Sequence, residues 1–379
     1  MAGLVTLALL GCASGTNAGE TGMAGGVVPR EPLNYSDLQG WSVDGQTLAL
    51  EAFRRSCTRL LKLNARDPLD KKNDSGFYGT AGDWFDACRA AGKVGAGDDA
   101  ARGFFESYFV PVRVSNGSEA GLFTGYYEPE MKGSLSRHGV FQTAILSFPA
   151  EFASAQRSGQ ILPTRAEIED RIRSGSIDAD RLAVVWLEDP VDAFFLHVQG
   201  SGRVTLEDGA ILRVAFAAKN QRPYTSIGKV LIDQGAIPRE EVSMQTIRAW
   251  LKAHPADVGP LLRRNESYIF FKVIQADDDL GPPGAEGVSL TPERSLAVDR
   301  SVHPLGSLFW LETTAPVPHT DRVTPFRHLM VAQDTGTAIR GVERGDVFWG
   351  PGTDAAEIAG RMKEPGHLVA LLPRGLTGR

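Results

Sequence analysis

The chain has 379 residues, of which 42% are hydrophobic and 23% charged, as in a globular protein with one large or two smaller domains. Forty Lys and Arg residues against 46 Asp and Glu give a net charge of −6 without a basic block, which argues against nucleic acid as the main partner. Forty-two glycines and 22 prolines favour a loop-rich, β-containing architecture over a helical bundle.

The N-terminal segment, residues 1–30, carries a targeting signal. Residues 2–11 are apolar but too short to span a membrane, so they resemble the hydrophobic part of a signal peptide. The tetrapeptide Leu9-Leu10-Gly11-Cys12 resembles the bacterial lipoprotein lipobox, which implies lipidation of Cys12; a plain cleaved signal is the alternative. Because Ala13 and not Asp follows, this resemblance implies a lipoprotein on the periplasmic side of the outer membrane of a Gram-negative bacterium.

Three helical patterns follow, over residues 48–63, 81–91 and 98–109. Cys57 lies in the first pattern and Cys88 in the second. An even pair of cysteines in an exported protein favours a disulfide, which would join two N-terminal helices. Neither cysteine has a His or Cys at ligand spacing, so we predict no metal site, and no cofactor motif is complete.

The pattern then changes to strands over residues 112–114 and 122–128. In the segment FTGYYEPE the adjacent Tyr126 and Tyr127 point to opposite faces of an extended chain, so at least one is expected to be exposed. Stacking against a sugar ring and half-buried anchoring of an edge strand are equally open interpretations.

Residues 134–265 form a mixed unit that we interpret as an insertion. Its predicted helices and strands are a capped helix from Thr164 to Ile172, strands at 183–187 and 193–198, a hairpin turning at Asp208-Gly209, and helices at 226–234 and 238–254. Residues 268–274 are predicted to form a further buried strand. The rest of the segment 266–379 is β-like and predicts a small barrel or sandwich, with strands at 295–298, 307–311, 329–331, 347–349 and 368–372.

Two aspartates stand out in the last part of the chain. Asp334 follows the apolar run Leu329–Ala332 and opens a Gly/Thr turn, and Asp346 leads into Val-Phe-Trp. Carboxylates beside apolar and aromatic side chains are candidates for a raised pKa and acid/base chemistry. The alternative is that Asp334 caps a turn and Asp346 is a solvated loop acid.

Other motifs are incomplete. Asp334-Thr335-Gly336 resembles an aspartic-protease loop, but the second candidate, Asp74-Ser75-Gly76, has no apolar strand before it. The Ser226-x-x-Lys229 motif lacks its companion motifs, and Asp277-Asp278-Asp279 does not fit the alternating ligands of a calcium loop.

Five ordered motifs carry a family resemblance: FTGYYEPE, FFLHVQGSGR, ESYIFFK, LAVDRSVHPLGS and AQDTGTAIRGVERGDVFWGPG. Together they resemble the membrane-bound lytic murein transglycosylase A (MltA) family over residues 110–375, including its C-terminal three-aspartate (3D) module. The three aspartates fall on Asp299, Asp334 and Asp346.

The resemblance implies a mainly β fold with a helical N-terminal part. A double-ψ β-barrel would be assembled from residues 31–133 and 266–379, with a second β-rich domain inserted at 134–265 and a groove between the two. It also implies cleavage of the β-1,4 bond between N-acetylmuramic acid and N-acetylglucosamine in peptidoglycan, without water, to leave a 1,6-anhydromuramoyl end. The implied partner is the peptidoglycan glycan strand, bound by a monomer.

By the family pattern Asp346 is the acid/base, and Asp334 holds or tunes it. Such an acid needs a raised pKa, and the adjacent Phe348 and Trp349 are expected to supply the desolvation. The implied glycan-contacting residues are Thr124, Tyr126, Tyr127, Gln199, Ser201, Gly202, Lys272, Asp299, Gly336 and Trp349. An ion pair between Asp299 and its neighbour Arg300 is the alternative for that aspartate. A non-catalytic glycan-binding or wall-loosening module and a water-using muramidase, which would require a second carboxylate, are the alternative functions.

Overall fold

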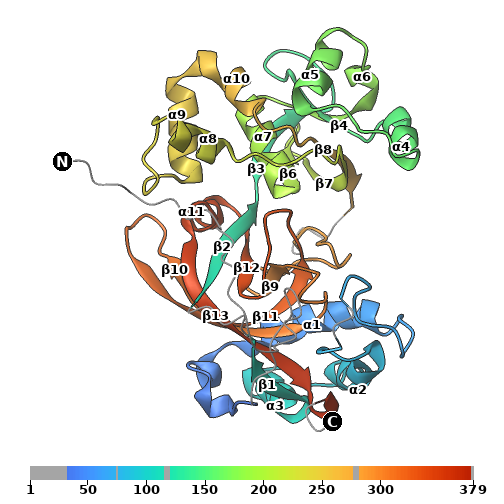
Figure 1. Cartoon of the computed structure of the whole chain (residues 1–379), viewed down its shortest axis with the longest axis vertical. Helices are drawn as coiled ribbons and strands as arrows, with labels where there is room; N and C mark the ends of the chain where they lie inside the picture. Colours follow the sequence, from blue (N-terminus) through green and yellow to red (C-terminus); the bar gives the residue numbers. More distant parts are fainter. Residues whose placement is uncertain (1–31, 74–75, 115–119, 276–280, 377–379) are drawn as a thin grey trace, which may run out of the picture.

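The computed structural model describes residues 32–73, 76–114, 120–275 and 281–376. A closed β-barrel lies at the centre of the molecule, with the N-terminal helices on one side and a second β-rich domain on the other (Figure 1). The predicted fold class is confirmed by this arrangement and by the structural relatives reported below. Cys12, Asp277–Asp279 and part of the Asp74-Ser75-Gly76 motif lie outside the described residues.

The N-terminal part forms the three predicted helices, α1 (Gln46–Leu60), α2 (Ala81–Ala91) and α3 (Asp98–Tyr108). Their apolar faces meet in an aromatic cluster in which Phe53 contacts Trp84, Phe105 and Phe109 at ring-centroid distances of 6.4, 6.3 and 5.7 Å. A disulfide between Cys57 and Cys88 joins α1 to α2. Short 3₁₀ helices lie at Tyr35–Asp37, Trp41–Val43, Pro255–Asp257 and Arg374–Leu376.

The barrel is built from strands at both ends of the chain. They are β2 (Gly121–Glu128), β9 (Ser295–Val298), β10 (Leu308–Pro316), β11 (Val323–Asp334), β12 (Arg344–Pro351) and β13 (Lys363–Pro373). The order is β13-β10-β11-β9-β12-β2, and pairing of β2 with β13 closes the barrel, while β1 (Phe109–Arg113) pairs with β13 from outside. Closure removes the exposed strand edges that an open sheet would present.

The second domain is a six-stranded sheet of order β4-β5-β3-β6-β7-β8 with helices around it (Figure 1). Its strands are β3 (Glu130–Ser134), β4 (Thr143–Leu146), β5 (Ala183–Leu187), β6 (Ser201–Thr205), β7 (Ile211–Lys219) and β8 (Ile269–Ile274). Its helices are α4 (Ala150–Arg157), α5 (Arg165–Arg173), α6 (Ala179–Leu182), α7 (Pro190–Gln199), α8 (Ile227–Asp233), α9 (Met244–Ala253) and α10 (Val258–Leu262). β2 of the barrel runs past Pro129 directly into β3, so one extended segment joins the two domains. The sheet of the second domain thus begins before residue 134 and ends after residue 265.

The predicted strand over residues 193–198 is wrong, because this segment lies inside α7. The Asp189 side chain caps the helix by accepting from the Val191 N–H, and Pro190 occupies its first turn. The helix is buried on most of its circumference, so the segment has no amphipathic period and resembles a buried strand in sequence.

Two further helices differ from the sequence prediction. The helix predicted over 238–254 begins only at Met244, where Ser243 caps it by accepting from the Thr246 N–H. Helix α11 (Thr353–Arg361) was not predicted, because it buries only the small side chains of Ala355 and Ala359 against the barrel. Across the residues described here, no helix is long and apolar enough to span a bilayer.

The disulfide gives the first testable prediction. It joins cysteines that are 31 residues apart and so restricts the unfolded chain. Replacing both Cys57 and Cys88 by Ala should therefore lower the free energy of unfolding by about 2–4 kcal/mol. Urea unfolding of the oxidised protein and the double variant measures this difference. Coincident unfolding midpoints would show that the bridge does not stabilise the fold.

Candidate active site

Asp334 and Asp346 lie in one row across the barrel wall. Asp334 at the end of β11 and Asp346 in β12 are both register partners of Ala297 in β9, and Asp346 is also opposite Thr124 in β2. Directly opposed residues of neighbouring strands project to the same face of a sheet. The two carboxylates therefore share a face, with their backbones two strand spacings, or roughly 10 Å, apart.

Asp346 is half-buried and accepts a hydrogen bond at Oδ1 from the Thr124 hydroxyl, at 2.6 Å. Burial raises the pKa of Asp346 to about 6. The Thr124 hydrogen bond and the Arg344 charge oppose this rise, and the nearby Asp334 carboxylate adds to it. A carboxyl group with this pKa can be protonated and ionised in turn near neutral pH.

Asp334 is held by three donors. Its Oδ1 accepts from the backbone N–H groups of Ala285 and Thr335, both at 2.9 Å, and its Oδ2 accepts from the Tyr126 hydroxyl at 3.0 Å. Burial raises the pKa of Asp334, although these three hydrogen bonds act to lower it. Its geometry is thus fixed by β2, by its own turn and by the segment before β9.

The alternation of β2 and β12 decides which predicted residues reach this face. Tyr126 and Phe348 are register partners beside the aspartates, with ring centroids 5.2 Å apart. Trp349 points to the opposite face, where its ring packs on Phe326 at a centroid distance of 5.0 Å. Trp349 therefore does not lie beside Asp346, so the desolvation expected from it must come from Phe348 and the surrounding chain.

Gly125 explains the glycine between Thr124 and Tyr126. A Cβ atom on Gly125 would lie 2.6 Å from Nε1 of Trp349 and 2.8 Å from Cα of Ala359, so no other residue fits there without movement. Tyr127 points to the same side as Trp349 and is buried with Ala355 and Ala359. The two tyrosines thus face opposite ways, and only Tyr126 lies beside the aspartates.

The QGSG turn lies at the junction of the domains. Gln199 ends α7 and accepts the Tyr127 N–H at Oε1, at 3.2 Å. Gly202 is buried, and a Cβ there would meet the side-chain ends of Met131 and Leu196 at 2.7 and 2.8 Å, so a larger residue would require these two side chains to move. Ser201 and the exposed Lys272 are both register partners of Ala215, which sets them in one row of the second sheet.

Asp299 supports the loop that precedes β12. It is 4% exposed, and its carboxylate accepts from the Ser301 hydroxyl at 2.7 Å and from the Gly341 N–H at 2.9 Å. Burial acts to raise the pKa of Asp299, but these hydrogen bonds and the Arg340 charge hold it below its usual value. The ion pair with Arg300 is wrong, because Arg300 instead contacts Asp70 at 2.6 Å.

Two contributors were missed in the sequence. Arg344 donates from Nη2 to the Thr124 hydroxyl oxygen at 2.8 Å, and its position two residues before Asp346 on one strand already places both on one face. The Ala285 N–H has no sequence signal, because it comes from an irregular segment. Gly336 lies in the turn after Asp334, where its carbonyl accepts from the Ile339 N–H.

Comparisons with known proteins show the family of the chain. The family profile "MltA specific insert domain" matches residues 122–272, and "3D domain" matches residues 294–372. The solved structure of the membrane-bound lytic murein transglycosylase from Agrobacterium tumefaciens is 33% identical, with a TM-score of 0.79 over 92% of this chain and 99% of that one. The chain belongs to the MltA family.

Two further MltA proteins are informative. Membrane-bound lytic murein transglycosylase A of Escherichia coli is 37% identical over 257 residues, which are 66% of this chain and 65% of that protein. The aligned part thus spans slightly less than two thirds of this relative. The structure of E. coli MltA with bound chitohexaose has a TM-score of 0.65 and 29% identity over 90% of this chain and 94% of that one. The predicted resemblance to MltA is confirmed.

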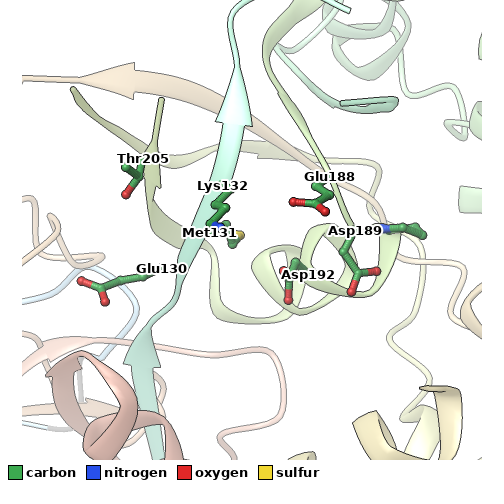
Figure 2. A pocket seen from close by; sticks show the side chains of 8 residues that line it. Glu130, Met131, Lys132, Glu188, Asp189, Asp192 and Thr205 are labelled. Atoms are coloured by element: carbon green, nitrogen blue, oxygen red, sulfur yellow. The ribbon is translucent and has the colours of Figure 1, made fainter. Parts of the chain in front are cut away.

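This MltA-family chain also has a pocket in its second domain, with a volume of about 720 Å³. Figure 2 shows its lining, in which Glu130 of β3 lies on one side of Lys132, and Glu188, Asp189 and Asp192, from the segment before α7 and from α7 itself, lie on the other. The lining residues are Glu130, Met131, Lys132, Glu188, Asp189, Pro190, Asp192 and Thr205. Within the described residues, no group of three or more His, Cys, Asp or Glu side chains is arranged to hold a metal ion.

The raised pKa of Asp346 predicts a pH-dependent cost to stability. Its folded pKa of about 6 lies above the unfolded value of about 3.9, so the stability it contributes is fully present below pH 3.9 and is lost as the pH rises through 6. Asp346→Asn cannot ionise. Its free energy of unfolding relative to wild type should therefore increase by about 1–2 kcal/mol as the pH is raised from 4.5 to 8.

Chemical unfolding of both proteins at the two pH values tests this. Asp321→Asn, at an exposed position, is the matched control for replacing an aspartate by asparagine. An equal stability difference at pH 4.5 and pH 8 would contradict the raised pKa.

Proposed function

We propose that this protein is a lytic transglycosylase that cleaves the β-1,4 bond between N-acetylmuramic acid and N-acetylglucosamine in peptidoglycan. The product end is a 1,6-anhydromuramoyl group, formed without water. The observation that carries the proposal is a half-buried Asp346, with a pKa of about 6, on the same face of the barrel as Asp334. Membership of the MltA family supports the reaction class.

Asp346 acts first as an acid and then as a base. Its protonated carboxyl donates to the glycosidic oxygen as the bond from that oxygen to the anomeric carbon breaks, and N-acetylglucosamine leaves with a hydroxyl group. The C6 hydroxyl of the muramoyl residue then bonds to the anomeric carbon and loses its proton to the Asp346 carboxylate. At pH 7 about one molecule in ten carries the starting proton, given a pKa of about 6.

The hydrogen bonds of Asp334 favour this one-acid mechanism over hydrolysis. A water-using glycosidase needs a second carboxylate that is free to act as base or nucleophile. Both oxygens of Asp334 already accept hydrogen bonds from fixed donors, two of them backbone N–H groups. Asp334 is therefore better suited to raising the pKa of Asp346 by its charge and to holding Tyr126.

The glycan strand is the proposed substrate and partner, bound along a groove between the barrel and the second domain. Tyr126, Ser201 and Lys272 are the predicted contacts with the best placement, since Tyr126 lies beside the aspartates and the other two share a row of the second sheet. Gly336 and Thr124 lie next to the two aspartates, while Asp299, Gln199, Gly202 and Tyr127 act mainly by supporting the site. Binding of chitohexaose by E. coli MltA supports a groove for a β-1,4-linked sugar chain.

We further propose that Cys12 carries a lipid that anchors a monomer to the periplasmic side of the outer membrane. The membrane-bound names of the relatives support this location. Mass spectrometry of the mature protein extracted from membranes tests it, since a lipidated N-terminal Cys12 is heavier than a plain cleaved chain.

The test of the activity is mass spectrometry of muropeptides released from purified sacculi by protein truncated after Cys12. We expect products one water lighter than reducing muropeptides, and we expect Asp346→Asn to lower their release by at least about a hundredfold. Asp321→Asn, exposed and outside the site, is the matched control and should cleave like wild type.

The other outcomes separate the alternatives. Reducing ends would establish a water-using muramidase. Retention of the protein on sacculi without release of any product would establish a glycan-binding module. Undiminished cleavage by a folded Asp346→Asn protein would overturn the assignment of the acid.

A further inference from the structure

A three-residue chain of hydrogen bonds leads to the proposed acid. Arg344 donates from Nη2 to Oγ1 of Thr124 at 2.8 Å, and Thr124 donates from Oγ1 to Oδ1 of Asp346 at 2.6 Å. All three side chains are half-buried, on the paired strands β2 and β12. Hydrogen bonds in a partly buried, low-dielectric site are stronger than in water.

The direction of these hydrogen bonds is fixed by the donors available. The guanidinium group can only donate, so the Thr124 oxygen must accept from Arg344. The single hydroxyl proton of Thr124 is then directed to Asp346. Oδ1 of Asp346 is thus held as an acceptor in both protonation states, and since a carbonyl oxygen accepts better than an acid hydroxyl, the acid proton sits on Oδ2.

We propose that Arg344 is a positioning residue that acts through the Thr124 hydroxyl to hold the transferable proton of Asp346 on Oδ2. This inference rests on the proposed function, in which Asp346 delivers that proton to the glycosidic oxygen. Without this chain of hydrogen bonds, either carboxyl oxygen of Asp346 carries the proton, and the Thr124 hydroxyl can rotate. A general acid must present its proton in one geometry, so the loss appears in the chemical step.

The charged and titratable groups around Asp346 define what else acts on it. Arg344 comes from β12, Asp334 from β11 and Tyr126 from β2. Lys363 is the register partner of Thr124 in β13, and its side chain is exposed. Arg344 and Lys363 thus flank Thr124 on its two sides, and only Arg344 belongs to the hydrogen-bonded chain.

This placement offers matched variants. Thr124→Val removes the hydroxyl with little change in shape, and Thr124→Ser restores it. Arg344→Met removes the donor, and Lys363→Met removes a positive charge beside Thr124 without breaking the chain. Since Arg344 also donates to the carbonyl oxygens of Leu122 and Gly345, Thr124→Val is the variant that leaves the strand contacts intact.

The experiment is steady-state cleavage of soluble, uncrosslinked glycan strands by the protein from which residues 1–12 have been removed. We expect Thr124→Val and Arg344→Met each to lower kcat by roughly tenfold to a hundredfold, with KM changed by less than about twofold. The double variant should be no slower than the slower single variant, because both changes break one chain. Thr124→Ser should recover most of the rate, and Lys363→Met should match wild type.

The pH profile gives a second readout. The Thr124 hydrogen bond and the Arg344 charge both lower the pKa of Asp346, so removing either should move the alkaline limb of kcat to higher pH. Multiplying losses in the double variant, no recovery in Thr124→Ser, or an equal effect of Lys363→Met would each overturn the proposal.

A readout without catalysis separates this inference from the proposed function. If wild type releases no anhydro product, the proposed function fails whatever the variants do. NMR titration of ¹³C-labelled aspartate carboxyl groups, assigned with Asp346→Asn, then still measures the pKa of Asp346 and so tests the chain of hydrogen bonds from Arg344 through Thr124. An upward pKa shift of Asp346 in Thr124→Val and Arg344→Met but not in Lys363→Met supports it, and no shift overturns it.

Discussion

The pairing of β2 with β12 is the interaction on which the site depends. β2 comes from the N-terminal part of the chain and β12 from the C-terminal part, and their parallel register sets Thr124 opposite Asp346 and Tyr126 opposite Phe348. A shift of one residue would turn Thr124 and Tyr126 to the opposite face and leave both aspartates without their side-chain partners. Gly125 allows close packing on the other face, since a Cβ there would clash with Trp349 and with the backbone of α11 at Ala359.

A buried polar network connects the Asp334 segment to the N-terminal helices. Gln333, next to Asp334, donates to the Ala52 carbonyl and the Ser56 hydroxyl of α1, both at 2.9 Å, and Ser56 donates to Glu286 at 2.6 Å. Burial raises the pKa of Glu286 to about 7, against the Ser56 hydrogen bond and the Arg59 charge. Because Ala285 donates to Asp334, the segment bearing Glu286 is held between α1 and the site. The helices thus help to position the candidate site as well as to fill the core.

The sequence predicted the barrel strands and N-terminal helices because their apolar periods match their burial. It failed at α7, which is buried nearly all round, and at α11, which buries only small side chains. Motifs located Asp334 and Asp346, but they did not show that Trp349 faces away from Asp346 or that Asp299 accepts from the Gly341 N–H, since the direction of a side chain depends on strand register and on long-range partners. The Ala285 N–H left no trace in the sequence, whereas Arg344 was detectable from its i, i+2 spacing to Asp346.

Opposing effects on Asp346 explain why its site needs so many fixed partners. Burial and the Asp334 charge raise its pKa, and the Thr124 hydrogen bond and Arg344 charge lower it, with the balance at about 6. A direct Arg–Asp ion pair would favour the charged form strongly and leave little acid near neutral pH. The intervening Thr124 hydroxyl keeps the cation one hydrogen bond away, so it can orient the carboxyl group while burial still dominates. The same burial that suits Asp346 to the proposed acid role makes its ionised form destabilising, so the barrel and the helices behind it must supply the compensating stability.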